Sequence, residues 1–447
     1  MASEQNGPHR SWDPTDRRGS WAGDDQRNPL RAQHTHLMEG GRRGKVPFWP
    51  TGLDEFQALV EATLSQDERG RNVLAYLCGT AGAGRTAAAN RRAFHDHAII
   101  PDVLAGADIR DHQITVLGTP MAAPLMLAPI GGLDMAHPSA DVHIAEAAAD
   151  LGLPWILSPA ASVTPEDIQQ LVPQGRDRRW FELLFSASDQ LNTSLLTRAE
   201  KAGFEVLVVN VDTALPGWRP RTLDAAAWPF DRGCGAAAYR SDPHFQALVE
   251  DPDDPASVGR AFARLSTDSS RTWHDLTLLR RRWPGRLAVK GILTARDTRN
   301  ALDCGADCVI VSNHGGRQLD GTLSTLEALP AVVHAARDVP VLLDGGIRSG
   351  LDMFIALALG AKAVLVGLPY ALGVALDGYD GVHHVLANLL ADYDHTMALA
   401  GVCSPSQLHP SRLHSRPRSP SLLTTPWPTA TRDNPGLIQS RQPRGET

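Results

Sequence analysis

Eight short apolar runs recur along the middle of the chain, and each is followed by a stretch with the residue pattern of a helix. The runs are residues 124–129, 154–159, 179–185, 205–212, 286–291, 308–313, 339–346 and 363–367. Strands that alternate with helices form parallel sheets. Eight consecutive repeats predict an α/β fold, a closed (β/α)8 barrel of the TIM type. An open doubly wound sheet is the alternative, but the chain has no early GxGxxG segment to support it.

The segments outside these repeats differ in composition. Residues 1–48 are polar and lack a hydrophobic period, which predicts a disordered N-terminal arm. Residues 405–447 contain eight prolines separated by Ser, Thr and Arg, which predicts a disordered tail. Residues 49–404 then form one barrel domain that begins with a helical segment. Within it, residues 221–272 are too long for an ordinary loop after the fourth strand and predict an excursion over the barrel mouth, a lid by position.

The composition narrows the classes of partner. A net charge of −7 and a pI near 6.2 give no electrostatic reason to expect nucleic acid or an anionic membrane. No stretch reaches about 18 apolar residues, and the N-terminus lacks the apolar core of a secretory signal. The five cysteines are scattered, and no second pair or histidine cluster makes Cys304 and Cys308 a metal site. The sequence predicts a cytoplasmic protein with reduced thiols and no bound metal.

A polar side chain, a proline or a glycine closes each apolar run. In chain order these are Pro129, Ser158, Glu182, Asp212, Lys290, Ser312 with His314, Asp344 and Gly367. Barrel enzymes build their active sites at the C-terminal ends of the strands. We therefore expect these residues to meet at one rim. The alternative is that each residue merely terminates a strand. It does not explain why such a residue occurs at the same place, the end of the apolar run, in all eight repeats.

Residues 312–321, SNHGGRQLDG, directly follow one of the apolar runs. His314 is a titratable base, and Arg317 supplies a fixed cation three residues later. An unselected histidine is more often a surface residue without a chemical role. Lys290 ends an otherwise apolar strand, where an unpaired ammonium would cost several kcal/mol or lose its proton. A base, a guanidinium and an ammonium with an anionic partner are thus predicted at one site.

This decapeptide, together with residues 126–138, 211–223, 241–245, 272–280 and 341–367, resembles the family of FMN-dependent enzymes that oxidise L-2-hydroxy acids, which includes glycolate oxidase. The resemblance spans roughly residues 50–404, and GWRPR at 217–221 is most similar to the lactate 2-monooxygenase branch. It implies FMN as cofactor and a lactate-like L-2-hydroxy acid and O2 as substrates. In the monooxygenase branch, the retained 2-oxo acid is oxidatively decarboxylated. The resemblance also implies a tetramer or octamer.

The resemblance assigns roles near the substrate. It implies that His314 takes a proton from the substrate and that Asp212 stabilises the resulting imidazolium. Arg317 and Arg219 hold the substrate carboxylate in planar forks, and Tyr76 adds a hydrogen bond. Whether the hydrogen on C2 leaves as a hydride or as a proton stays open. From the residues alone, solvated ion pairs are the alternative for the two arginines, and a packed helix aromatic is the alternative for Tyr76.

The resemblance also places the cofactor at these strand ends. Lys290 lies beside the flavin N1 and C2 carbonyl, Asp344 contacts the ribityl chain, and Arg348 helps to hold the phosphate with backbone amides at a helix N-terminus. An internal salt bridge is the alternative for Lys290. The residues implied to contact the cofactor are Pro129, Ile130, Gly131, Ser158, Glu182, Asn210, Lys290, Ser312, Asp344, Gly345, Gly346, Arg348 and Gly367.

Five positions depart from the family pattern. Asn210 stands where threonine is usual, which exchanges one hydrogen-bonding group for another. Glu182 replaces a glutamine at the flavin ring, and Leu184 replaces a tyrosine that helps to bind substrate. Ala160 replaces a bulkier residue near the substrate, and Leu368 replaces an arginine on the phosphate. The changes at Glu182, Leu184 and Leu368 favour an alternative function, a non-catalytic barrel that binds flavin weakly. A phosphosugar or nucleotide enzyme is a third reading, but such an enzyme has no reason to keep the base and both arginines.

Overall fold

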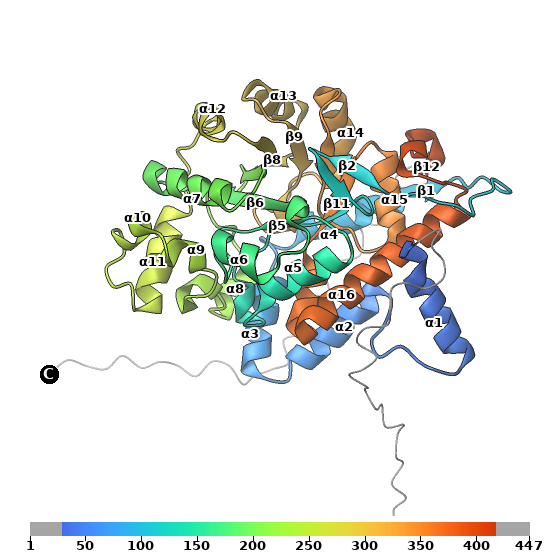
Figure 1. The fold of residues 1–447 in the computed structure, drawn as a ribbon, viewed down its shortest axis with the longest axis horizontal. Helices are drawn as coiled ribbons and strands as arrows, with labels where there is room; N and C mark the ends of the chain where they lie inside the picture. Colours follow the sequence, from blue (N-terminus) through green and yellow to red (C-terminus); the bar gives the residue numbers. More distant parts are fainter. Residues whose placement is uncertain (1–28, 417–447) are drawn as a thin grey trace, which may run out of the picture.

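The structure, a computed structural model, describes residues 29–416. Eight parallel strands close into a barrel in sequence order (Figure 1). The strands are β4 Leu125–Leu127, β5 Trp155–Leu157, β6 Arg179–Leu184, β7 Val206–Asn210, β8 Arg286–Ile292, β9 Cys308–Val311, β10 Val341–Leu343 and β11 Ala363–Val366. Each lies within one of the predicted runs or extends it by a residue, and the predicted barrel is confirmed.

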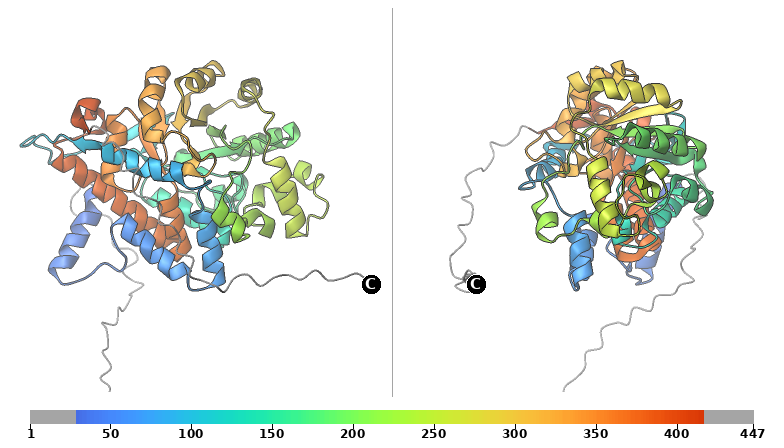
Figure 2. Two further views of the ribbon diagram at one scale, coloured as in Figure 1. Left: turned by 180° about the vertical axis from the view of Figure 1, so that it is seen from behind. Right: turned by 90° about the vertical axis from the view of Figure 1, so that its left-hand side faces the viewer.

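A helix follows each strand before the next strand begins, and these helices surround the barrel (Figure 2). Local sequence fixes where they start: Ser324 and Glu327 form a reciprocal capping box at α14, and the Ser349 hydroxyl accepts from the Asp352 amide at α15. The helices are α5 Ala140–Asp150, α6 Pro165–Leu171, α7 Asp189–Lys201, α12 Trp273–Arg282, α13 Ala295–Asp303, α14 Thr325–Ala336, α15 Gly350–Ala358 and α16 Leu368–Leu399.

Two apolar layers stabilise the barrel. One lies between the strands and the surrounding helices, and the other fills the barrel interior with side chains such as Met126, Ile156 and Ile310. A hairpin of β2 (Ile114–Val116) and β3 (Thr119–Met121) packs on the interior layer, and Trp180 Nε1 donates to Thr119 Oγ1 at 2.8 Å. Because Trp180 lies at the start of its strand, the hairpin covers the N-terminal end of the barrel. The opposite end remains for a ligand.

Helices α2 (Leu53–Leu64) and α3 (Glu68–Leu77) precede the barrel and pack on α16, and α4 (Arg85–Arg92) follows them. Short 3-10 turns link these elements and others: η2 Pro29–Arg31, η3 Ala93–Asp96, η4 Leu133–Met135, η5 Arg176–Arg178, η7 His314–Gly316, η8 Pro405–Gln407 and η9 Pro410–Arg412. Cys304 and Cys308 are buried thiols. Across residues 29–416, no helix has both the length and the apolar character needed to cross a bilayer.

The predicted excursion at residues 221–272 lies between β7 and α12 and is mostly helical. In Figure 1 its helices α9 to α11 form a separate group at one end of the molecule. Trp228, Phe230 and Phe262 from this segment line the cavity described below. Its elements are α8 Pro220–Asp224, η6 Pro229–Arg232, α9 Ala237–Arg240, α10 Pro243–Gln246 and α11 Pro255–Leu265.

The predicted disordered N-terminal arm is wrong for residues 32–42, which form helix α1 (Ala32–Arg42). Gln33 Nε2 donates to Asn388 Oδ1 of α16 at 3.0 Å, and the His34 ring lies 4.8 Å from the His395 ring. Helix α1 buries no side chain, so it shows no apolar period in the sequence. Polar and ring contacts attach it to α16, and residues 1–28 lie outside the described part of the chain.

The predicted disordered C-terminal tail is wrong in the same way for residues 405–416. Strand β12 (Leu413–Ser415) pairs antiparallel with β1 (His97–Ile99). The Arg416 amide donates to the Asp96 carbonyl at 2.7 Å, which extends the ladder. A three-residue strand that pairs with a segment about 300 residues earlier leaves no local periodicity to read. Residues 417–447 lie outside the described residues.

Candidate active site

A cavity of about 340 Å³ lies at the C-terminal end of the barrel, and residues at or just after the C-terminal ends of all eight strands line it. Its volume is typical of small-molecule sites. Of the predicted site residues, Asp212 and Ser312 do not line it but contact residues that do. Those that line it are Tyr76, Pro129, Ile130, Gly131, Ser158, Glu182, Asn210, Arg219, Lys290, His314, Arg317, Asp344, Gly345, Gly346, Arg348 and Gly367. The predicted residues therefore share one rim, and their individual roles stay predictions.

His314 is paired with Asp212 through one ring nitrogen. Its Nδ1 lies 3.4 Å from Asp212 Oδ1, which is long for a hydrogen bond and leaves the attraction largely electrostatic. Burial raises the pKa of Asp212, but the His314 ring and the Lys290 ammonium lower it further, so it lies below its usual value. A fixed carboxylate therefore lies beside the ring and orients it. The pairing leaves Nε2 for a ligand in the cavity.

The backbone around His314 is unusual. His314 has φ of +58°, a left-handed conformation that side chains other than glycine rarely adopt, and residues in such regions concentrate at functional sites. The His314 amide donates to Ser312 Oγ at 3.0 Å, and Lys290 Nζ donates to the same oxygen at 3.0 Å. Ser312 thus connects the histidine loop to the lysine of the neighbouring strand.

Gly291 positions Asp212 against His314. A β-bulge separates Lys290 from Ile292 in the pairing of β8 with β9, and Gly291 within it has φ of +111°. A Cβ atom on Gly291 would lie 2.8 Å from both Cβ and Cγ of Asp212. The carboxylate can occupy its place beside the histidine only because residue 291 has no side chain.

Lys290 has the anionic partner that its burial requires. Its Nζ lies 3.0 Å from Asp344 Oδ2, and both side chains are buried. Burial lowers the pKa of Lys290, but Asp344 and Asp212 raise it above its usual value, so the ammonium stays charged. Asp344 Oδ1 is buried and has no hydrogen-bond partner within the described residues. The salt bridge foreseen as an alternative for Lys290 is present, and both of its members still line the cavity.

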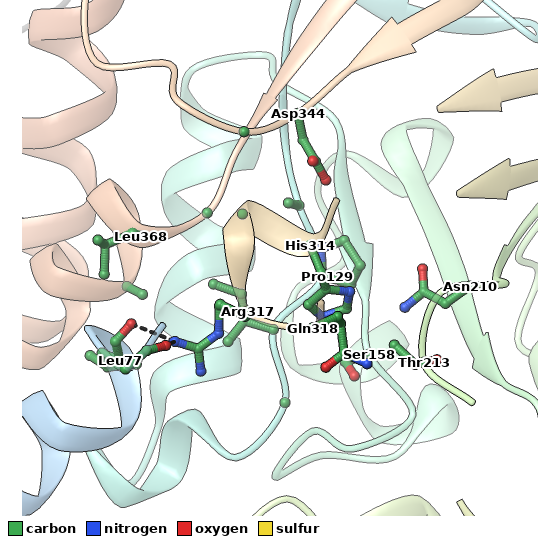
Figure 3. A pocket seen from close by; sticks show the side chains of 18 of the residues that line it. Leu77, Pro129, Ser158, Asn210, Thr213, His314, Arg317, Gln318, Asp344 and Leu368 are labelled. Atoms are coloured by element: carbon green, nitrogen blue, oxygen red, sulfur yellow. Dashed lines mark hydrogen bonds between the residues drawn. The ribbon is translucent and has the colours of Figure 1, made fainter. Parts of the chain in front are cut away.

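Two guanidinium groups lie beside Tyr76. Arg317 donates to the carbonyls of Leu77 and Gly79 at 2.8 and 2.7 Å, the first of which is drawn in Figure 3, and its Cζ lies 5.3 Å from the Tyr76 ring centre. Arg219 donates to the Arg317 carbonyl at 2.9 Å. Burial, with Arg317 nearby, lowers the pKa of Arg219 to about 9. Within the described residues, the hydrogen-bond partners of both arginines are carbonyl and amide oxygens and not carboxylates, so a ligand anion fits between them.

Tyr76 has a protein partner in this structure. Its hydroxyl donates to the Gly131 carbonyl at 2.8 Å, and burial raises the pKa of the phenol. The oxygen still has lone pairs that can accept from a substrate hydroxyl. The ring packs in the core and also lines the cavity, and the predicted hydrogen bond to a substrate stays a prediction.

Glu182 is a buried carboxyl with two donors. Ser158 Oγ donates to its Oε2 at 2.8 Å, and Asn210 Nδ2 donates to its Oε1 at 2.5 Å. Burial raises the pKa of Glu182 even though Lys290 and both donors act in the opposite direction. Asn210 Oδ1 is buried without a partner among the described residues and remains an acceptor on the cavity wall.

The loop after β10 and the start of α16 form a glycine-rich end of the cavity. Gly345 and Gly346 both have φ of +92°, which favours glycine, and a Cβ atom on Gly346 would lie 2.6 Å from the Asn90 carbonyl oxygen. Leu368 begins α16 here, as Figure 3 shows, where the family resemblance leads one to expect an arginine. Arg348 lines this end, and burial together with Arg91 lowers its pKa to about 10.

Three polar groups of the site were missed by sequence reasoning. Arg91 lines the cavity, and its Nη1 donates to the Gly346 carbonyl at 3.3 Å. Gln318 accepts from Arg219 Nη2 at 3.0 Å and donates to the Asp212 carbonyl at 3.0 Å. Asn90 exchanges amide hydrogen bonds with Asn313 at 2.8 Å. Of the three, only Gln318 could have been found from the sequence, because it belongs to the SNHGGRQLDG segment. Nothing in the sequence indicates that Arg91 lines the cavity while the adjacent Arg92 is exposed.

Comparison with known proteins assigns these features to one group. Residues 66–415 match the model of a family described as FMN-dependent dehydrogenase. An FMN-dependent α-hydroxy acid dehydrogenase of Penicillium citrinum is 37% identical over 374 residues, which are 81% of this chain and 92% of that protein. An L-lactate oxidase of Lysinibacillus sphaericus is 35% identical over 330 residues, 74% of this chain and 85% of that protein.

A solved structure has the same fold. It is a soluble mutant of the membrane-associated (S)-mandelate dehydrogenase from Pseudomonas putida, with a TM-score of 0.70 and 31% identity over 82% of this chain and 99% of that one. The family match reaches residue 415 and therefore includes β12, so the domain extends beyond the predicted boundary at residue 404.

Proposed function

Since the chain belongs to the FMN-dependent α-hydroxy acid dehydrogenase and oxidase family, it is an FMN enzyme that oxidises a 2-hydroxy acid to a 2-oxo acid, and we propose that its substrate is the L-enantiomer. We also propose that His314 is its base and that O2 accepts the electrons. The His314–Asp212 pair, beside Arg317 and Arg219 in one cavity, carries this proposal. A base that faces two anion-binding side chains suits proton removal from a carboxylic acid substrate.

The residues present fit the cofactor. Glu182 and Asn210 offer hydrogen-bond acceptors to the flavin ring, and Lys290 offers a buried ammonium. Asp344 Oδ1, which has no partner among the described residues, can accept from ribityl hydroxyls. The glycine loop after β10 and the N-terminus of α16, with Arg348, suit a phosphate. When bound, FMN supplies an acceptor for the two electrons released from C2 of the substrate.

Each substrate group has a partner in the cavity. Arg317 and Arg219 hold the carboxylate, which brings C2 and its hydroxyl next to His314. His314 Nε2 takes a proton from the substrate, and the ionised Asp212 stabilises the imidazolium. One 2-hydroxy acid and one O2 give one 2-oxo acid and one hydrogen peroxide. The choice between hydride and carbanion routes stays open, and a comparison of substrate and solvent isotope effects distinguishes them.

The alternative of a non-catalytic barrel is tested by colour. We expect the purified protein to show flavin absorption bands that bleach anaerobically when an L-2-hydroxy acid is added and stay unchanged with its D-enantiomer. A colourless protein that FMN does not reconstitute would support the non-catalytic alternative, for which Glu182, Leu184 and Leu368 are the motive.

Oxidative decarboxylation, as in lactate 2-monooxygenase, is a second candidate outcome. The 221–272 segment lines the cavity with Trp228, Phe230 and Phe262. A cavity covered in this way favours retention of the product while peroxide is present. Analysis of products after aerobic turnover separates the two outcomes. An oxidase gives the 2-oxo acid and free peroxide, whereas a monooxygenase gives carbon dioxide and an acid one carbon shorter. The predicted tetramer or octamer is tested separately by sedimentation.

Replacing Glu182 with glutamine is expected to stabilise the protein progressively as the pH rises. Burial raises the pKa of Glu182 in the folded state, so ionisation opposes folding once the pH exceeds the unfolded value of about 4.3. Below that pH both states are protonated and the substitution has little effect. Thermal unfolding of the apoprotein between about pH 4 and 7 measures the difference in stability between E182Q and the unaltered protein. A difference independent of pH contradicts the prediction.

Replacing Arg91 with alanine is expected to weaken FMN binding by about tenfold. Its guanidinium lies at the glycine-rich end of the cavity, where Leu368 offers no charge, but its ion pair with Asp54 and its partial exposure limit the effect. Riboflavin lacks the phosphate, so its affinity should not change. Titration of the apoprotein with each flavin measures both, and R92A is the matched control on the exposed side of α4. Equal losses for FMN and riboflavin contradict the phosphate contact.

A further inference from the structure

A continuous row of aromatic rings lines one wall of the cavity. Tyr76 of α3 lies edge-on to Trp228, with 6.3 Å between ring centres. Trp228 lies edge-on to Phe230 at 5.8 Å, and Phe230 stacks on Phe262 at 4.4 Å. All four residues line the cavity, and the last three come from the 221–272 segment. We call these four residues the aromatic row.

The two anion-binding arginines stand at one end of this row. The Arg317 Cζ lies 5.3 Å from the centre of the Tyr76 ring, and the Arg219 Cζ lies 5.5 Å from the centre of the Trp228 ring. Phe230 and Phe262 continue the row beyond Trp228. A 2-hydroxy acid whose carboxylate binds the arginines and whose C2 lies near His314 therefore has its C2 substituent beside the aromatic row.

The remaining lining near the row is also largely apolar. Ala160, Leu184, Leu215 and Pro216 contribute no charged group to the cavity. Ser266 and Thr267 are the neutral polar side chains that the end of the 221–272 segment adds. A methyl or hydrogen substituent on C2 leaves these surfaces without a partner, whereas a large apolar substituent covers them and is removed from water.

The row is held in place by close backbone contacts to the barrel loops. The Gly235 amide donates to Asp134 Oδ2 at 3.1 Å, and the Gly132 amide donates to the Ala160 carbonyl at 2.9 Å. A Cβ atom on Gly132 would lie 2.6 Å from Pro229 Cγ, and one on Gly235 would lie 2.4 Å from the Ala160 carbonyl oxygen. The segment therefore packs against the loops after β4 and β5 with no room for side chains between them, and the wall is preformed.

We propose that the enzyme selects 2-hydroxy acids with a large apolar substituent on C2, such as phenyl, benzyl or branched alkyl, over glycolate and lactate, and that Trp228 and Phe230 determine this specificity. The inference rests on the proposed function, because it assumes that Arg317 and Arg219 bind the substrate carboxylate. A hydrophobic pocket that is filled rather than left partly empty discriminates by about 10–200-fold.

A substrate series tests the proposal on the holoenzyme. Anaerobic flavin bleaching is followed in a stopped-flow instrument with glycolate, L-lactate, L-2-hydroxy-4-methylpentanoate, L-mandelate and L-3-phenyllactate. We expect at least one of the three larger acids to exceed L-lactate at least tenfold in the ratio of reduction rate to dissociation constant. If no acid bleaches the flavin, the proposed function fails. If glycolate or L-lactate is the best substrate, the proposed function stands and the selectivity proposal is overturned.

Two variants locate the selectivity. Phe230→Ala removes a ring of the row that contacts neither arginine, and it should lower the ratio for the best large acid about tenfold while changing that for L-lactate less than about threefold. Trp228→Ala should act in the same direction, although it also removes the ring beside Arg219. Trp218→Ala is the matched control, because Trp218 is 74% exposed and does not line the cavity. Equal losses for large and small acids in F230A overturn the assignment of Phe230.

Discussion

Replacing His314 with alanine is expected to slow flavin reduction by about 10²–10⁴-fold while FMN stays bound. The ring is the base in the cavity that is already paired with a carboxylate of lowered pKa, so no other described group can take over the proton with the same support. Lys290 and both arginines, which line the same cavity, remain charged and cannot accept a proton. The rate is measured as anaerobic bleaching at saturating substrate, and retained FMN is measured from the visible spectrum.

A second substitution distinguishes loss of the base from loss of folding. His314 has a left-handed backbone, which asparagine tolerates better than alanine does, so His314→Asn should fold and remain equally slow. His334→Ala, an exposed histidine on α14, is the matched control and should keep the normal rate. Either His314 variant bleaching at the normal rate would remove His314 as the base.

Replacing Arg317 with lysine is expected to lower kcat/KM by about 10²-fold. An ammonium can still donate to the Leu77 and Gly79 carbonyls, so the loop contacts survive. It cannot present two parallel donors to a carboxylate, and the planar fork is what fixes the substrate relative to His314. Steady-state kinetics with the best 2-hydroxy acid measure the loss, and a rise in KM should accompany any fall in kcat.

Arg260→Lys provides the control, because Arg260 is a largely exposed residue of α11 with a weak ion pair to Asp254 at 3.6 Å. It should leave the kinetics unchanged. If Arg317→Lys also keeps kcat/KM within about threefold of the unaltered enzyme, the carboxylate does not bind at Arg317. Arg219 would then be the principal cation, and the row of rings that begins at Tyr76 would lie elsewhere relative to the substrate.

The barrel was predictable because its strands are short apolar runs that repeat without interruption. β7 and β9 are buried at every position, so even their brief segments are visible in the sequence. Helix α1 was not visible, because it buries no side chain and attaches through contacts such as Gln33 to Asn388. Strand β12 was missed because a pairing of three residues with β1 depends on a distant segment that its own sequence does not specify.

The site residues at the C-terminal ends of the barrel strands were predictable, whereas those contributed by other parts of the chain were not. Lys290, His314 and Asp344 could be placed together because the barrel brings all strand ends to one rim. Arg91 could not, because it reaches the cavity from a helix that precedes the barrel. The aromatic residues of the 221–272 segment could not either, because their position depends on how that segment packs against the loops after β4 and β5.

The pairing of the His314 base with Asp212 depends on Gly291. Its missing Cβ leaves the space that the Asp212 carboxylate occupies beside the ring. An alanine there would displace the carboxylate by steric overlap, so the imidazole would lose the partner that orients it. Natural or engineered variation at a residue that does not line the cavity would in this way disturb the base indirectly.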